Sequence, residues 1–272
     1  MSSTFPPLHP PRRFNQTLPQ PDGRPGVIDA YLARARDATA PGVVVLHEML
    51  GVNADMQQVC DRLAAQGFHA LCPDMYWRQR PRALFSEHDN TEREEALALG
   101  RSFDVDLGVN DLQHVMDWLR QLDGQTRKVG CVGYCLGGLL SYRVAACCRS
   151  DAAVVYYGVG IERHLDEVHT VACPLLIHLA AQDDFIPPST LVAMSQALRP
   201  VFGLELHQYP NTRHGFARRG GKHFDAGAAA LADERSHAVL KAHLLPASAA
   251  SGSAPGSASA SGSDSGAGSA PA

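Results

Sequence analysis

The chain has 272 residues, of which 45% are hydrophobic, and its formal net charge is −4 at pH 7. This length and apolar content are sufficient for one α/β domain with a sizeable core, so no disulfide or metal is needed to stabilise it. Acidic and basic residues are scattered rather than grouped, which gives no electrostatic indication of a nucleic-acid or anionic-membrane surface. We therefore expect a small molecule as the partner, no nucleic acid or membrane, and a monomer.

The cysteine pattern indicates a reducing environment. The seven cysteines are an odd number and none stands in a C-x-x-C pair, which argues against a disulfide framework or a zinc site. The first residues, "MSSTFPPLHPPRRFNQ", lack the apolar core of a signal peptide, and no stretch approaches the ~18 apolar residues of a membrane span. We expect a soluble, cytoplasmic protein that holds no metal.

Composition divides the chain into three parts. Residues 1–20 are Pro-rich and expected to be extended, and residues 21–246 are expected to form a single domain. Residues 247–272 are an Ala/Ser/Gly run without large apolar side chains, which cannot bury enough surface to offset chain entropy. This last segment is predicted to be a disordered tail.

Strand-like and helix-like segments alternate within the domain, and the strand-like runs are continuously apolar, as in parallel strands covered on both faces. The expected parallel strands are 42–47, 68–74, 128–134, 152–158, 174–180 and 204–210, with 27–35 as an antiparallel edge strand. The expected helices are 53–67, 106–122, 136–148 and 230–244, with a Pro-started helix after residue 184. This order predicts an α/β fold with a doubly wound, mostly parallel sheet, whose ligand lies beyond the carboxyl ends of the strands.

The run "KVGCVGYCLGG" has the G-x-S-x-G spacing of a nucleophile elbow, with Cys135 at the central position. Such a turn strains its central residue and needs nearly side-chain-free neighbours, here Gly133 and Gly137. A helix beginning at Leu136 would favour the thiolate and offer its first N–H to an oxyanion. The alternative is that Cys135 is one more small, buried hydrophobic residue, which is how we interpret the other six cysteines.

A histidine base and a carboxylate follow the cysteine in the order typical of α/β-hydrolases. Asp183 and Asp184 come after the strand 174–180, and His214 comes after the strand 204–210. Each alone is explained as a turn, helix-cap or solvated loop residue. Their joint order, each after a strand, favours a catalytic triad, although the pattern does not choose between the two aspartates.

These residues resemble a known family. "GYCLGG", "QDDFIP" and "HGFAR", with "HEMLGVN" and "PDMYWRQ" upstream, are similar to motifs of the dienelactone hydrolases (carboxymethylenebutenolidases), which are single-domain α/β-hydrolases with a Cys-Asp-His triad. The resemblance spans residues 27–245. It implies Cys135 as nucleophile, Asp183 as triad acid and His214 as base, because the first Asp of the family pattern D-x-F-[VI]-P is the catalytic one.

The resemblance also assigns residues around the triad. It implies that Glu48 helps to deprotonate the thiol, that the N–H of Met49 joins that of Leu136 in the oxyanion hole, and that Arg78 and Arg218 hold a substrate carboxylate. The alternatives are a helix-start carboxylate for Glu48 and solvated surface charges for the arginines.

Two residues depart from the family pattern, His47 beside Glu48 and Ala180 at the start of the acid loop. The charged segment 78–104 is expected to overhang the site and to make the substrate hard to predict.

The predicted function is hydrolysis of an enol-lactone or related carboxylate-bearing ester, of the dienelactone-to-maleylacetate type. Cys135 would form a thioacyl-enzyme that water then hydrolyses, with no metal or organic cofactor. One alternative is a broad carboxylesterase or thioesterase with the same triad. Another is a non-catalytic binding protein that keeps the scaffold, since a fold does not determine a function.

Overall fold

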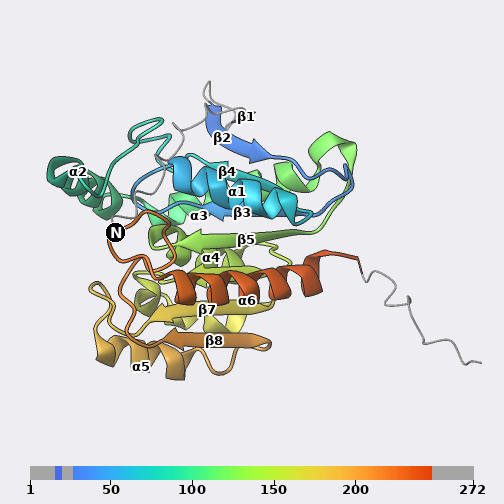
Figure 1. The fold of residues 1–272 in the computed structure, drawn as a ribbon. Helices are drawn as coiled ribbons and strands as arrows, with labels where there is room; N and C mark the ends of the chain where they lie inside the picture. Colours follow the sequence, from blue (N-terminus) through green and yellow to red (C-terminus); the bar gives the residue numbers. More distant parts are fainter. Residues whose placement is uncertain (1–15, 20–26, 247–272) are drawn as a thin grey trace, which may run out of the picture.

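An eight-stranded sheet organises the chain in the computed structural model, which describes residues 16–19 and 27–246 (Figure 1). The strand order is β1-β2-β4-β3-β5-β6-β7-β8; β1 and β2 run antiparallel to their neighbours, and the other six strands are parallel. The strands are β1 (Gln16–Pro19), β2 (Val27–Ala33), β3 (Gly42–Leu46), β4 (His69–Pro73), β5 (Val129–Tyr134), β6 (Ala153–Tyr156), β7 (Leu175–Ala180) and β8 (Leu204–Tyr209). The predicted fold, a doubly wound and mostly parallel sheet, is confirmed.

Helices cover both faces of this sheet. They are α1 (Ala54–Ala65), α2 (Asn90–Arg101), α3 (Val105–Arg120), α4 (Leu136–Cys147), α5 (Pro188–Ala197) and α6 (Ala226–Leu244), with short 3₁₀ turns η1 (Leu122–Gly124), η2 (Ile161–Arg163) and η3 (Leu165–Thr170). Helices α1 and α6 pack on one face, seen in front in Figure 1, and α3, α4 and α5 pack on the other. In β5, Val129 and Cys131 face one core and Val132 and Tyr134 the other, which explains its continuous apolar sequence.

The amino-terminal edge of the sheet differs from the prediction. Strand β2 was expected at the edge, but β1 pairs with it, with Thr17 opposite Asp29 and Leu18 buried in the core. The prolines around β1 obscured its signal, yet an edge strand tolerates them because one side of it needs no partner. The rest of segment 1–20 and the tail 247–272 lie outside the described residues, so the domain boundaries stay a prediction.

Helix α2 lies within the charged segment 78–104, for which no helix was expected. Asp89 caps it by accepting hydrogen bonds from the N–H groups of Thr91 and Glu92. Only Ala96 of this helix is buried, so it shows no apolar stripe from which to predict it. Its helical signal was the acidic cap followed three residues later by a glutamate.

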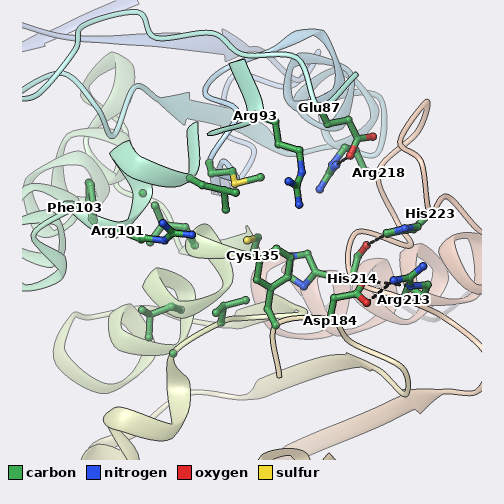
Figure 2. A pocket seen from close by; sticks show the side chains of 18 of the residues that line it. Glu87, Arg93, Arg101, Phe103, Cys135, Asp184, Arg213, His214, Arg218 and His223 are labelled. Atoms are coloured by element: carbon green, nitrogen blue, oxygen red, sulfur yellow. Dashed lines mark hydrogen bonds and ion pairs between the residues drawn. The ribbon is translucent and has the colours of Figure 1, made fainter. Parts of the chain in front are cut away.

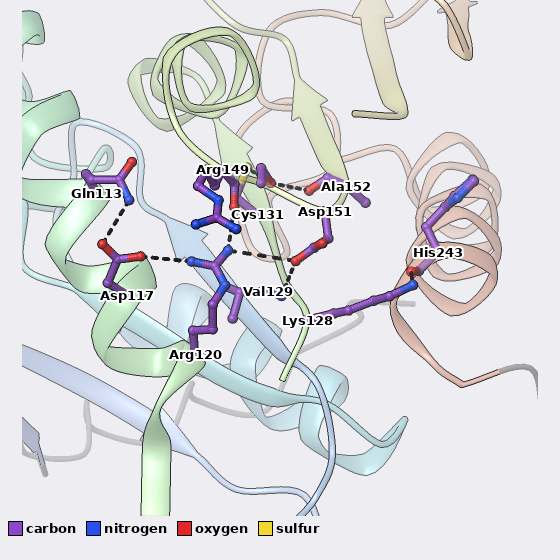
Figure 3. A network of polar contacts seen from close by, with 11 residues as sticks. Gln113, Asp117, Arg120, Lys128, Val129, Cys131, Arg149, Asp151, Ala152 and His243 are labelled. Carbon is purple, nitrogen blue, oxygen red and sulfur yellow. Dashed lines mark hydrogen bonds and ion pairs between the residues drawn. The ribbon is translucent and has the colours of Figure 1, made fainter. Parts of the chain in front are cut away.

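A polar network ties down the amino end of β5, whose other end carries the predicted nucleophile (Figure 3). Arg120 of α3 pairs with Asp117 at 2.9 Å and donates to the carbonyl of Arg149. The carboxylate of Asp151 lies 3.8 Å from the same guanidinium and accepts the first N–H of β5, from Val129, at 2.8 Å. The network therefore couples α3, β5 and the loop before β6.

We expect Arg120→Ala to lower the free energy of unfolding by about 1–2 kcal/mol, because it leaves a carbonyl and a carboxylate without their partner. Urea denaturation measures the change, and Arg36→Ala, which removes an exposed arginine from a loop, is the matched control. The predicted ester hydrolysis at low urea should stay unchanged, since the network lies at the other end of β5. An unchanged unfolding midpoint would contradict the proposed anchoring.

Candidate active site

Cys135 occupies a strained turn between β5 and α4. Its backbone angles are φ 54° and ψ −113°, a region that side-chain-bearing residues rarely adopt and that costs on the order of 1–3 kcal/mol. The turn is held by hydrogen bonds from the N–H of Cys135 to the carbonyl of Tyr156 and from the N–H of Leu139 to the carbonyl of Cys135. The thiol is partly exposed at the amino end of α4. This is the geometry expected of a nucleophile elbow.

The two glycines around Cys135 are required by close backbone contacts. A Cβ atom on Gly133 would lie 1.8 Å from the carbonyl oxygen of Gly137, and one on Gly137 would lie 2.1 Å from that of Leu46. Both obstacles are main-chain atoms, which cannot move aside as a flexible side chain could. The glycine spacing read from the sequence therefore reflects the packing of α4 against β5 and the end of β3.

His214 is held by Asp183 and not by Asp184. The Nδ1 atom of His214 lies 2.9 Å and 3.1 Å from the two carboxylate oxygens of Asp183, whose side chain is fully buried. Asp184 turns away and forms an ion pair with Arg213 (Figure 2). The geometry therefore pairs His214 with the first of the two aspartates, and the role of Asp183 as triad acid stays a prediction.

Aromatic rings fix the plane of the imidazole. The ring of Phe185 lies 4.6 Å from that of His214 and the ring of Tyr157 lies 4.9 Å from it, both nearly edge to face. Burial alone would lower the pKa of His214, but the negative charges of Cys135 and Asp183 outweigh it and raise the pKa to about 10. The imidazolium form of His214 is therefore favoured at neutral pH.

Burial holds four of the other cysteines in the thiol form. Burial raises the pKa of Cys131 and of Cys148 to about 12 and that of Cys173 to about 11, and it raises the pKa of Cys72 as well. These groups stay protonated at neutral pH, and a thiol is a far poorer nucleophile than a thiolate. Their structural interpretation agrees with this result.

His47 fixes the peptide that precedes Met49. The N–H of Met75 donates to its Nε2 at 3.0 Å, so the proton sits on Nδ1, which donates to the carbonyl of Glu48 at 2.6 Å. Burial lowers the pKa of His47, which keeps the ring neutral and this pattern intact. The same peptide carries the N–H of Met49, which has no acceptor among the described residues, and both Met49 and Leu136 line the cavity.

Glu48 and Arg218 form a buried ion pair beside the cavity. The carboxylate of Glu48 accepts from Nε of Arg218 at 2.5 Å, and the other Glu48 oxygen has no hydrogen-bond partner in the part of the chain described. Arg218 is also paired with Glu87, which comes from the charged segment before α2. Although burial disfavours a charged guanidinium, these two carboxylates raise the pKa of Arg218.

Arg78 is not brought to this cavity. It makes a two-pronged ion pair with Asp111 at 2.7 Å and 3.0 Å, and its guanidinium stacks on the ring of Trp77 at 4.0 Å. Of the two arginines expected to bind the substrate, Arg218 lines the cavity and Arg78 does not. The spacing of the motif could not show this, because the partner, Asp111, is 33 residues away.

The cavity above Cys135 has a volume of about 670 Å³. Cys135, His214 and Arg218 line it together with Arg93 and Arg101 of α2, so the segment 78–104 does border the site (Figure 2). Its wall includes apolar side chains, among them Phe103, and several cations. A pocket of this kind is typical of a small-molecule site with a few convergent polar groups.

Sequence reasoning missed several of these residues. Tyr157 and Phe185 orient the imidazole, and Glu87 supports Arg218, yet none stood out in the sequence. Asp55 is a further omission: it is buried at the start of α1, and burial, followed by the charge of Glu48, raises its pKa to about 7. Phe185 lies inside the motif "QDDFIP", which was the only signal available for any of them.

Two features are absent from the described residues. Within residues 16–19 and 27–246, no group of three or more His, Cys, Asp or Glu side chains is arranged to hold a metal ion. In the same part of the chain, no helix has both the length and the apolar character that a membrane crossing requires.

Comparison with known proteins identifies the family. The family model described as "Dienelactone hydrolase family" matches residues 28–244. This chain belongs to the dienelactone hydrolase family. The predicted resemblance is confirmed, and so is the prediction of an enzyme that hydrolyses an ester or lactone bond.

Relatives of this dienelactone hydrolase family member cover most of its length. The carboxymethylenebutenolidase of Pseudomonas putida is 41% identical over 206 residues, which are 76% of this chain and 87% of the relative. Carboxymethylenebutenolidase 1 of Cupriavidus pinatubonensis is 35% identical over 215 residues, 79% of this chain and 92% of the relative.

A similar solved structure supports the fold of this family member. It is that of a dienelactone hydrolase-like promiscuous phosphotriesterase from metagenomic libraries, with a TM-score of 0.68 and 20% identity. The likeness covers 85% of this chain and 98% of that chain. At this identity, the likeness concerns the fold alone.

We expect Cys135→Ala to lower the pKa of His214 by about one unit or more, because a nearby charge shifts a pKa by about 1–3 units. The raised pKa means that the stabilisation from the charged ring is full below pH 6.5 and is lost as the pH rises through about 10. NMR titration of the imidazole measures the shift, with Cys147→Ala as control. An unchanged pKa in Cys135→Ala would show that the thiolate does not act on the ring.

His47→Ala should reduce kcat for a simple ester about tenfold with little change in KM, because the Met49 peptide loses its anchor while its N–H remains; deleting an oxyanion donor outright costs ~10²–10³. His47→Gln should restore much of the rate, since a carboxamide also carries one donor group and one acceptor. Steady-state kinetics test this, with thermal unfolding to monitor stability. Full kcat in a folded His47→Ala variant would refute the positioning role.

Proposed function

We propose that this protein opens an enol-lactone or related carboxylate-bearing ester, with Cys135 as nucleophile, His214 as base and Asp183 as the residue that orients it. One observation carries the proposal: a strained, cavity-facing cysteine stands beside a histidine that a buried aspartate holds at 2.9 Å. The carboxymethylenebutenolidase relatives support the same substrate class.

In the proposed reaction, the thiolate of Cys135 attacks the carbonyl carbon and forms a tetrahedral oxyanion. The backbone N–H groups of Leu136 and Met49 donate to that oxygen, and collapse expels the enolate and leaves a thioacyl-enzyme. His214 protonates the leaving oxygen and then removes a proton from water, which attacks the thioester and releases the acid. The cycle consumes one water and regenerates the thiolate–imidazolium pair.

Arg218 gives this proposal its preference for an anionic substrate. In the empty site, its guanidinium is paired with Glu48 and Glu87. A substrate carboxylate that binds Arg218 would compete with Glu48 for it and free the Glu48 carboxylate to accept the thiol proton. The unpaired oxygen of Glu48 supports such a shift, since a buried carboxylate oxygen without a donor is costly.

The two alternative functions predict different properties of the site. A broad carboxylesterase or thioesterase would use the same triad but would treat neutral and acidic esters alike. A non-catalytic binding protein would not need the strain at Cys135 or the buried Asp183–His214 pair. A cytoplasmic location and a monomeric state remain predictions.

Hydrolysis of cis- and trans-dienelactone, compared with 4-nitrophenyl acetate, tests the function. We expect Cys135→Ala to abolish both activities, and Arg218→Gln to reduce kcat/KM for the lactones about tenfold more than for the acetate, as a charge-assisted contact is lost. Because Arg218→Gln leaves Glu48 buried without its partner, Arg218→Lys provides a second variant that keeps the charge.

Labelling with iodoacetamide near neutral pH is the control for the nucleophile. One equivalent should react rapidly at Cys135 in a Cys147→Ser background, and Asp183→Asn should slow that reaction. Hydrolysis that survives in Cys135→Ala would overturn the proposed mechanism, and equal lactone and acetate preferences in all Arg218 variants would favour the broad esterase.

A further inference from the structure

Arg101 is a cation in the cavity wall that no carboxylate of the described residues neutralises. Of the arginines around it, Arg218 is paired with Glu48 and Glu87, and Arg213 is paired with Asp184. Arg101 has neither an ion pair nor a side-chain hydrogen bond within the part of the chain that the structure describes. Its charge is therefore available to a ligand.

The position of Arg101 separates it from the proposed carboxylate site. Arg101 ends α2, and in Figure 2 its guanidinium points toward Cys135 from the side opposite His214, whereas Arg218 lies above the imidazole. A basic residue in the last turn of a helix complements the helix dipole, which explains a cation at this position. The dipole does not explain why the side chain borders the cavity.

Apolar side chains accompany Arg101 in the cavity wall. Phe103 lies beside Arg101 in Figure 2, and the cavity is also lined by Val105, Leu136, Leu139 and Val159. A substrate chain that runs from the carbonyl carbon toward Arg101 would end at a guanidinium within a partly apolar wall. The cavity, at about 670 Å³, lies in the upper half of the range of small-molecule pockets, which provides room for such a chain beside the reacting group.

We propose that Arg101 is a specificity-determining residue that binds a carboxylate at the far end of the substrate's acyl chain, at a position separate from Arg218, so that half-esters of linear dicarboxylic acids are also preferred substrates. The ester carbonyl lies at Cys135, the connecting chain lies along the partly apolar wall, and the distal carboxylate binds Arg101. The inference rests on the proposed hydrolytic function and adds a second binding position to it. Arg78, tied to Asp111, does not fill this role.

Mono-4-nitrophenyl esters of linear dicarboxylic acids test the inference against 4-nitrophenyl alkanoates of equal chain length. We expect kcat/KM for the acid, relative to its neutral counterpart, to pass through a maximum as the chain lengthens. Arg101→Gln should lower that maximum about tenfold, as expected for one lost charge-assisted contact. The rate with 4-nitrophenyl acetate should change little, because this substrate carries no distal group.

Two matched variants distinguish direct binding of the carboxylate by Arg101 from a general electrostatic attraction to the cavity. Arg93→Gln removes another cavity-facing arginine from the same helix, and Arg199→Gln removes an exposed arginine far from the cavity. If Arg93→Gln lowered the preference as much as Arg101→Gln, or if the preference did not depend on chain length, general attraction would explain it and the inference would be overturned.

A binding measurement keeps this inference separate from the proposed function. Calorimetry with Cys135→Ala protein should show tighter binding of the acidic ester than of the neutral one, and Arg101→Gln should remove the difference. If the wild-type protein hydrolysed none of these esters, the proposed function would be wrong. If Arg101→Gln left both the preference for the acidic ester and the hydrolysis of 4-nitrophenyl acetate unchanged, only the role of Arg101 would be wrong.

Discussion

The site depends on the strained backbone of Cys135. A turn of this kind persists only where the surrounding structure forces it, and here the force comes from main-chain packing. The carbonyl oxygens of Gly137 and Leu46 approach so closely that side chains on the two glycines are excluded. The same packing presents the thiol at the amino end of α4, beside His214 and the peptide of Met49. The packing that imposes this strain thus places the proposed nucleophile beside the proposed base and oxyanion donors.

Around this turn, charge is arranged in two buried pairs with different functions. Asp183 and His214 form a fixed pair, because aromatic rings hold the imidazole and both carboxylate oxygens are near Nδ1. Glu48 and Arg218 form a pair with an unsatisfied oxygen, next to Asp55, whose pKa is raised to about 7. A buried ion pair with an incomplete set of partners contributes little net stability. The second pair is therefore better suited to exchange partners with a substrate than to hold the fold together.

The sequence predicted those features that depend on local pattern. Continuous apolar runs placed six parallel strands within a few residues, and the spacing of Gly133 and Gly137 placed the elbow. Features that depend on distant partners could not be predicted in this way. Arg78 and Arg218 look equivalent in their motifs, but Asp111 removes the first from the cavity and Glu48 holds the second in it. Helix α2 escaped prediction because only Ala96 is buried, so its apolar periodicity is absent.

Under the proposed function, the missed helix is where this chain could vary its substrate without disturbing its chemistry. The proposed triad and oxyanion peptide stand at the ends of the strands and on α4, where a small change in backbone position would be felt by every reacting group. Helix α2 covers the cavity from outside, is mostly exposed, and is attached to the site through Glu87 and its cavity-facing arginines. Substitutions on α2 therefore alter the charge and shape of the binding surface at little cost to the fold. The proposals thus place specificity on the segment least constrained by the core, and catalysis on the segment most constrained by it.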